Sequence, residues 1–191
     1  MKKLLTILLI SFTSIIANAQ TSLKGCMGVN FGDSKAHVKS VMSTKSGFNP
    51  YKDDPDGLSY TDGSFAGHEA VGAIFKFYQD KLHTIIILLE IDPEPKAMDF
   101  YYSILNDLKD KYGVMYDKNH IYRSPYFAGD GYTVSGIKMG YIDISSLFTF
   151  DDGNALQVSI TSTMSLKLIY QDGHMIDAAI EADKEKNNAD Y

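Results

Sequence analysis

A strictly alternating stretch near the end of the chain constrains the fold more than any other feature. Over residues 155–164, apolar side chains alternate with polar ones: Leu156, Val158 and Ile160 against Gln157, Ser159, Thr161 and Thr163. Because successive side chains of a strand point to opposite faces, this pattern predicts an antiparallel strand with one face on the core and one in water. Asp152-Gly153-Asn154 predicts a hairpin turn from a preceding strand over residues 145–151. The stretch therefore predicts an antiparallel sheet with one solvated face.

Other segments supply the remaining elements of an α+β fold. Further strands are expected over residues 58–61, 70–78, 82–91, 132–141 and 166–170. The run Ile85–Leu89 does not alternate, which predicts a central strand buried on both faces. Helices are expected from Ser34 to Gly47, over residues 96–112 and, at the C-terminus, over residues 175–186. We expect these helices to pack on one face of the sheet.

The chain also divides into two similar halves, residues 28–95 and 96–170. Each half has the pattern of a helix followed by antiparallel strands. Ser64-Phe65-Ala66-Gly67 in the first half resembles Tyr126-Phe127-Ala128-Gly129 in the second. We interpret the halves as two tandem helix-plus-strands repeats. The alternative is ordinary α+β ordering without a duplication.

The first 19 residues predict a cleavable secretory signal peptide. Lys2 and Lys3 precede an apolar run, and Ala17-Asn18-Ala19 offers the small-x-small pattern that a signal peptidase accepts. Cleavage after Ala19 leaves Gln20 as the new N-terminus. The apolar run is shorter than the roughly 20 residues that a bilayer-spanning helix needs. We therefore expect one exported domain, residues 20–191, in the bacterial periplasm or outside the cell.

A lipid anchor at Cys26 is the alternative to cleavage at Ala19. Leu23-Lys24-Gly25-Cys26 partly matches the acylation box of bacterial lipoproteins. Lys24 fits that box poorly, and a polar or small stretch separates Cys26 from the apolar run. The sequence therefore favours cleavage at Ala19 without a lipid anchor.

The net charge limits the kinds of partner that the chain can bind, and the cysteine content limits how the fold can be stabilised. The whole chain carries a formal charge of −6, and the leader holds two lysines and no acid, so the exported domain carries −8. This acidic balance argues against nucleic acid or anionic lipid as partners through bulk electrostatics. A single cysteine allows no intramolecular disulfide, so stability must come from the packing of the core.

The sequence predicts neither a metal site nor a cofactor. Its five histidines have no spacing typical of metal ligands. Asp53, Asp54 and Asp56 partly match a calcium-binding loop, but Lys52 and Gly63 stand where that loop needs oxygen ligands. We expect the segment Asn49–Gly57 to be a turn-forming loop.

Two further groups could carry chemistry. Cys26 has no neighbouring histidine to form a thiolate, and we expect an inert thiol in a mobile lead segment. Glu90, Asp92 and Glu94 could act as an acid and base pair across a cleft. Pro93 and Pro95 between and beside them indicate an exposed connector instead.

Aromatic loops and the wet face of the sheet form the predicted contact surface. Tyrosine offers a large contact area at low entropic cost, which is typical of interfaces. The alternative is that most of the tyrosines pack against the sheet. The predicted partner-binding residues are Tyr51, Tyr60, Tyr126, Phe127, Tyr132, Gln157, Ser159 and Thr161.

The start of the first helix adds a resemblance to a known group. Phe31-Gly32-Asp33-Ser34-Lys35 and Val38, with the unit of helix and strands used twice, resemble the fold of beta-lactamase-inhibitor proteins and of small lipoproteins of the outer-membrane assembly machinery. The resemblance implies a curved sheet that presents aromatic and acidic residues to a partner enzyme. This chain lacks the inhibitors' disulfide cysteines and has only a poor match to the lipoproteins' acylation box, so no individual residue carries over.

Together these features predict a non-enzymatic binding protein of the bacterial envelope. Its partner would be another envelope protein or a small molecule, without nucleic acid, cofactor or a stable membrane span. The alternative is an envelope enzyme or small-ligand carrier with a site assembled from scattered residues. A deep pocket with convergent polar groups and shifted pKa values would favour that alternative.

Overall fold

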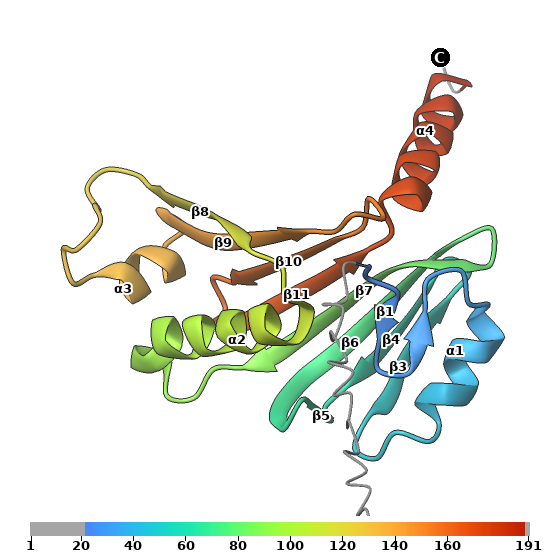
Figure 1. Cartoon of the computed structure of the whole chain (residues 1–191), viewed down its shortest axis with the longest axis horizontal. Helices are drawn as coiled ribbons and strands as arrows, with labels where there is room; N and C mark the ends of the chain where they lie inside the picture. Colours follow the sequence, from blue (N-terminus) through green and yellow to red (C-terminus); the bar gives the residue numbers. More distant parts are fainter. Residues whose placement is uncertain (1–21, 190–191) are drawn as a thin grey trace, which may run out of the picture.

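Antiparallel strand pairing organises the chain, and the computed structural model describes residues 22–189 (Figure 1). The main sheet runs in the order β3-β4-β6-β7-β11-β10-β9-β8, with β5 paired to β6 off this path. Its strands are β3 (Asn49–Asp54), β4 (Gly57–Thr61), β5 (Ser64–Phe65), β6 (His68–Tyr78), β7 (Lys81–Glu90), β8 (Tyr116–Tyr122), β9 (Ile142–Thr149), β10 (Ala155–Ile160) and β11 (Ser165–Gln171).

Helices and a small hairpin complete the fold, which confirms the predicted α+β class. The helices are α1 (Lys35–Met42), α2 (Ala97–Tyr112), α3 (Thr133–Lys138) and α4 (Gly173–Ala189), and a short 3-10 turn η1 (Glu94–Lys96) precedes α2. The hairpin consists of β1 (Gly25–Cys26) and β2 (Val29–Asn30). The predicted signal peptide and its cleavage site, Ala19 and Gln20, lie outside the described residues.

The two halves of the chain repeat one order of elements. In the first half, α1 is followed by β3, β4, β6 and β7; in the second, α2 is followed by β8, β9, β10 and β11. The first of these strands lies at an outer edge of the sheet and the last lies at its centre, where β7 pairs antiparallel with β11. The sheet therefore has the helix-plus-strands order twice, as the sequence predicted.

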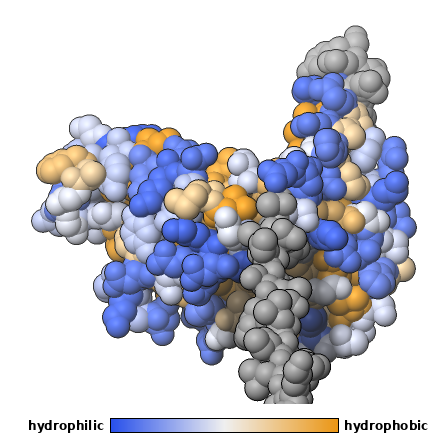
Figure 2. All heavy atoms as spheres, viewed as in Figure 1, coloured by the Kyte–Doolittle hydropathy of each residue, from blue (hydrophilic) through white to orange (hydrophobic). Residues whose placement is uncertain are grey.

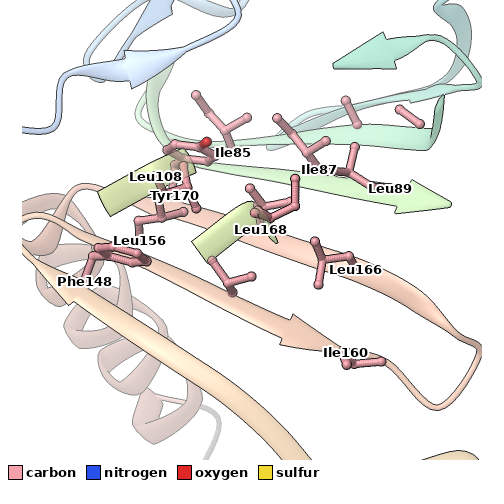
Figure 3. Close-up of a cluster of buried hydrophobic side chains, with 14 of the residues drawn as sticks. Ile85, Ile87, Leu89, Leu108, Phe148, Leu156, Ile160, Leu166, Leu168 and Tyr170 are labelled. Carbon is pink, nitrogen blue, oxygen red and sulfur yellow. The ribbon is translucent and has the colours of Figure 1, made fainter. Parts of the chain in front are cut away.

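The core lies on one face of this sheet, under α1 and α2. One row of directly paired, buried residues crosses six strands: Leu58, Phe75, Ile85, Tyr170, Leu156 and Phe148. Paired residues share a face, and Figure 3 shows the side chains from β7, β11, β10 and β9 pointing to the same side, with Leu108 of α2 among them. The helices bury Val38 and Met42 of α1, and Tyr101, Leu105, Leu108 and Tyr112 of α2.

The sequence explains why α2 forms where it does. Tyr101, Leu105, Leu108 and Tyr112 recur at helical spacing and face the sheet. The Tyr101 hydroxyl lies 2.7 Å from Ser146 Oγ of β9, so this buried polar pair is satisfied. Gly113 ends the helix at φ 66°, where its N–H donates to the Lys109 carbonyl.

The lead segment before β1 is tied into the body of the protein. Leu23 is fully buried, and its N–H donates to the Asp152 carboxylate over 2.9 Å. The Asn154 amide donates to the Leu23 carbonyl over 2.7 Å and accepts from Gly173 N–H over 3.1 Å. Cys26 itself lies in β1 and is partly buried, so the prediction of a mobile lead segment is wrong. These contacts join residues far apart in the chain.

Two predicted elements of the second half are wrong. The stretch predicted as a strand over residues 132–141 forms α3 instead, because Gly136 lets that helix approach Ile142 of β9 closely. The strand at this edge is β8, seven mostly polar residues that lack the apolar alternation of a half-buried strand. The strand predicted over residues 155–164 ends at Ile160.

Two predictions for the first half are also corrected. The segment expected to be a loop, Asn49–Gly57, contains β3, and only Pro55 and Asp56 turn. The reason is that β3 pairs with β4 across this turn, from Asn49 opposite Thr61 to Asp54 opposite Gly57. Lys35 and Lys39 of α1 also pair with Asp53. The first helix ends at Met42 rather than at Gly47.

Candidate functional site

The face of the sheet opposite α1 and α2, here called the open face, is the first candidate surface. Its central row consists of paired residues from consecutive strands: Ser59, Ile74, Ile86, Ile169, Gln157, Leu147 and Asp117. The neighbouring row holds Thr61, Gly72, Leu88, Lys167, Ser159, Ser145 and Asn119. The open face therefore has an apolar middle with polar side chains around it.

The central strand β7 explains this apolar middle. Ile85, Ile87 and Leu89 are fully buried on the helix side, whereas Ile86 and Leu88 on the open face are only partly buried. The prediction that this strand is buried on both faces is therefore wrong. Its central position in the sheet is as expected, but the described residues place no second layer over its middle.

The C-terminal helix α4 lies at one end of the open face. It projects from the body beyond β11, and the space-filling view shows a notch between it and the end of the molecule that carries β8 and α3 (Figures 1 and 2). Ile176, Ala179 and Ile180 of α4 line a cavity of about 530 Å³ together with side chains from the ends of β3, β4, β6 and β7. Those side chains include Asp54, Ser59, Ile74, Lys76 and His83.

The second candidate surface is the β8 end of the sheet. Among the described residues, seven of the ten exposed large apolar side chains lie between positions 115 and 147. They are Met115, Ile121, Phe127, Tyr132, Met139, Tyr141 and Leu147. Such a concentration of exposed apolar side chains in one region marks an interaction site more often than a plain surface.

An aromatic hollow lies at this end, in the loop between β8 and α3. Pro125, Tyr126, Phe127, Asp130 and Tyr132 line a space of about 430 Å³. The Asp130 carboxylate accepts from the N–H groups of Phe127 and Tyr132 over 3.0 and 2.8 Å. Tyr126 packs against Tyr141 at 5.6 Å between ring centroids. Phe127 and Tyr132 are thereby held with 65% and 64% of their surface exposed.

The structure separates the eight predicted partner-binding residues into several places. Tyr126, Phe127 and Tyr132 come together in the aromatic hollow, and Gln157 and Ser159 lie on the open face. Tyr51 is 74% exposed but lies on β3, at the opposite edge of the sheet.

One of the eight, Tyr60, is corrected as a contact residue, and Thr161 stays a prediction. Tyr60 is 8% exposed and packs against Phe75, so it belongs to the core; its alternation with Leu58 was the signal that could have identified it. Thr161 lies in the turn after β10, where its hydroxyl bonds to the backbone of Ser165. Sequence reasoning also missed Met115, Ile121 and Leu147, because single apolar residues among polar ones carry no periodic signal.

The groups considered for catalysis are not brought together. Burial raises the pKa of the Cys26 thiol, which disfavours the thiolate. Asp53 pairs with Lys35 and Lys39, which lower the pKa of its carboxyl. Glu90 and Glu94 are exposed, as a connector requires. Among residues 22–189, no group of three or more His, Cys, Asp or Glu side chains could hold a metal ion.

Two histidines are perturbed by partial burial. Burial, with Lys76 nearby, lowers the pKa of His83, whose Nδ1 lies 2.9 Å from Thr84 Oγ1. Burial, with Lys118 nearby, lowers the pKa of His120, whose buried Nε2 has no hydrogen-bond partner among the described residues. Both side chains are therefore favoured in the neutral form when the protein is folded.

A pH dependence of stability follows from these two shifts. Between the unfolded pKa of about 6.5 and the lowered folded values, the unfolded chain binds protons that the folded chain resists, so stability falls as pH drops through that window and levels off below it. We expect the urea concentration at the midpoint of unfolding to be lower at pH 5 than at pH 7.5. This decrease should be smaller in the double variant His83→Asn, His120→Asn. His174→Asn, at an exposed position, is the control. An equal fall in the wild type and the double variant would contradict the assignment.

Compared with known proteins, the chain matches no family model, no curated protein and no solved structure. Within the described part of the chain, no helix combines the length and the apolar character needed to cross a bilayer.

Proposed function

We propose that this chain is an exported, non-enzymatic interaction protein of the bacterial envelope that binds another protein through the open face of its sheet. One observation carries the proposal: Ile86 and Leu88 at the middle of that face are partly exposed, while α4 lies beside Ile74 at one end only. The resemblance of the sequence to inhibitor proteins that present a curved sheet to a partner is consistent with this assignment.

The composition of the open face suits a protein partner. Ile74, Ile86 and Ile169 are direct neighbours on three strands, so they offer one continuous apolar strip. Gln157 and Ser159 extend it with hydrogen-bonding groups. An apolar centre with a polar rim is the usual composition of a protein interface, and burying the strip would contribute about 25 cal/mol for each Å² removed from water.

Site-specific photo-crosslinking tests this proposal. A photoreactive amino acid at Gln157 or Ser159, in the protein exported from its own host, should yield one discrete adduct with another envelope protein. Asn106, exposed on α2 on the opposite side, is the matched control position and should yield none. Adducts of equal yield at all three positions, or none at any, would contradict the proposal.

A second candidate function is that of a small-ligand carrier, and the cavity under α4 is the observation that favours it. Its volume of about 530 Å³ lies within the range of small-molecule sites, and it combines apolar side chains of α4 with His83, Lys76 and Asp54. A compound that raises the melting temperature of the wild type, but not of Ala179→Trp, would support this role. Failure of a broad metabolite panel to shift the melting temperature would count against it.

A further inference from the structure

We propose that a second copy of this chain binds at the outer edge of β8, so that the two β8 strands pair antiparallel and join the two sheets into one. This association goes beyond the proposed function and does not depend on what binds the open face. It rests on three features of the β8 end.

The first feature is that proline and a register shift interrupt the β3 edge of the sheet but not the β8 edge. At the β3 edge, Pro50 removes a donor and the register shifts between Pro50 and Lys52, which are two usual means of blocking an edge. At the β8 edge, seven residues from Tyr116 to Tyr122 pair with β9 without a register shift, and they include no proline. The outer N–H and C=O groups of β8 therefore form a regular template for another strand.

The second feature is that the two ends of β8 are complementary in shape and chemistry. Met115, immediately before the strand, is 69% exposed, and the aromatic hollow of Pro125, Tyr126, Phe127 and Tyr132 follows its far end. In an antiparallel pair of identical strands, the start of one strand lies beside the end of the other. Each Met115 would therefore reach the partner's hollow, where a thioether packs well against aromatic rings. A second copy supplies this Met115 opposite the hollow, whereas a strand of an unrelated protein would not, so the match favours a second copy as the partner.

The third feature is the charge pattern along the strand. In the register that places His120 opposite the partner's His120, Asp117 lies opposite the partner's Arg123. Opposite charges in such cross-strand positions stabilise pairing. Arg123 already binds Asp143 over 2.6 Å, but its guanidinium has five N–H donors and can bind a second carboxylate. Ile121 lies on the same face and would be covered by the partner.

Sedimentation equilibrium of the exported protein tests the association. The mass should rise from that of one chain to that of two with concentration, and Met115→Glu and Ile121→Lys should each raise the dissociation constant by about tenfold or more. Tyr51→Lys is the matched control, because Tyr51 is also exposed but lies on the β3 edge. A monomer at every concentration up to about 1 mM, or an equal effect of Tyr51→Lys, would overturn the proposal.

Disulfide trapping tests the register. Under mild oxidation, His120→Cys should give a covalent dimer, because directly opposite residues of antiparallel strands lie within disulfide distance. Asn119→Cys should not, since in this register it lies opposite the partner's Ile121. A covalent dimer from Asn119→Cys alone would overturn the register, and no dimer from either variant would count against β8 pairing altogether.

Discussion

Phe148→Ala is expected to lower the free energy of unfolding by about 3–5 kcal/mol, whereas Leu147→Ala, one residue earlier on the same strand, should change it by less than about 1 kcal/mol. Phe148 is fully buried, pairs with Leu156 and packs against Tyr116 at 5.2 Å between ring centroids. Leu147 points to the open face and is 38% exposed. The contrast depends only on which face the helices cover.

Urea unfolding of the three proteins at pH 7.5 measures this contrast. A loss of this size is a large part of the roughly 5–15 kcal/mol that holds an ordinary domain together. Phe148→Leu, which keeps more of the volume, should therefore be measured as well and should cost less than Phe148→Ala. Equal losses from Leu147→Ala and Phe148→Ala would mean that both faces of β9 are covered in solution, which would also remove the basis for open-face binding.

A chain that starts at Cys26 is expected to be less stable than one that starts at Gln20 by several kcal/mol. Truncation removes the fully buried Leu23, and the loss of a buried leucine side chain costs about 2–5 kcal/mol. It also takes away the partner of the Asn154 amide, and a buried polar group left without a partner costs about 1–3 kcal/mol. Leu23 and its backbone contacts are therefore part of the folded protein.

This comparison bears directly on the lipid-anchor alternative, because acylation would make Cys26 the first residue. Leu23→Ala in the longer chain separates the contribution of the side chain from that of the backbone, and Lys24→Ala, at an exposed position, is the control. Thermal or urea unfolding measures all four proteins. If the chain that starts at Cys26 were as stable as the longer one, the case against a lipid anchor at Cys26 would lose its structural support.

Part of the structure followed from local patterns alone. The alternation around Leu156, Val158 and Ile160 identified β10 and the side that each of its residues faces. The helical spacing from Tyr101 to Tyr112, closed by Gly113, identified α2 almost to the residue. In both elements one side is buried and the other is exposed to solvent, so the periodicity of the sequence predicts both the type of element and the side that each residue faces.

The β8 end could not be predicted in this way. Strand β8 lies at an edge, where polar side chains are tolerated on both faces, and its seven residues carry no apolar period. Residues 132–141 include β-branched and aromatic residues typical of a strand, but they form α3, in which Ile137 is buried and Gly136 lies close to Ile142. Here tertiary packing outweighed local propensity. As a result, Met115 and the aromatic hollow lie at the two ends of the edge strand β8.

The sequence by itself determined the α+β class, helix α2 and the two faces of β10, because each depends on hydrophobic periodicity within single elements. Only the tertiary structure decided which surfaces remain uncovered. The run Ile85–Leu89 is apolar throughout, and nothing within it distinguishes a strand covered on both faces from one with a bare face. That distinction depends on whether distant segments supply a second layer, and Ile86 and Leu88 are partly exposed because the described chain supplies none over the middle of β7.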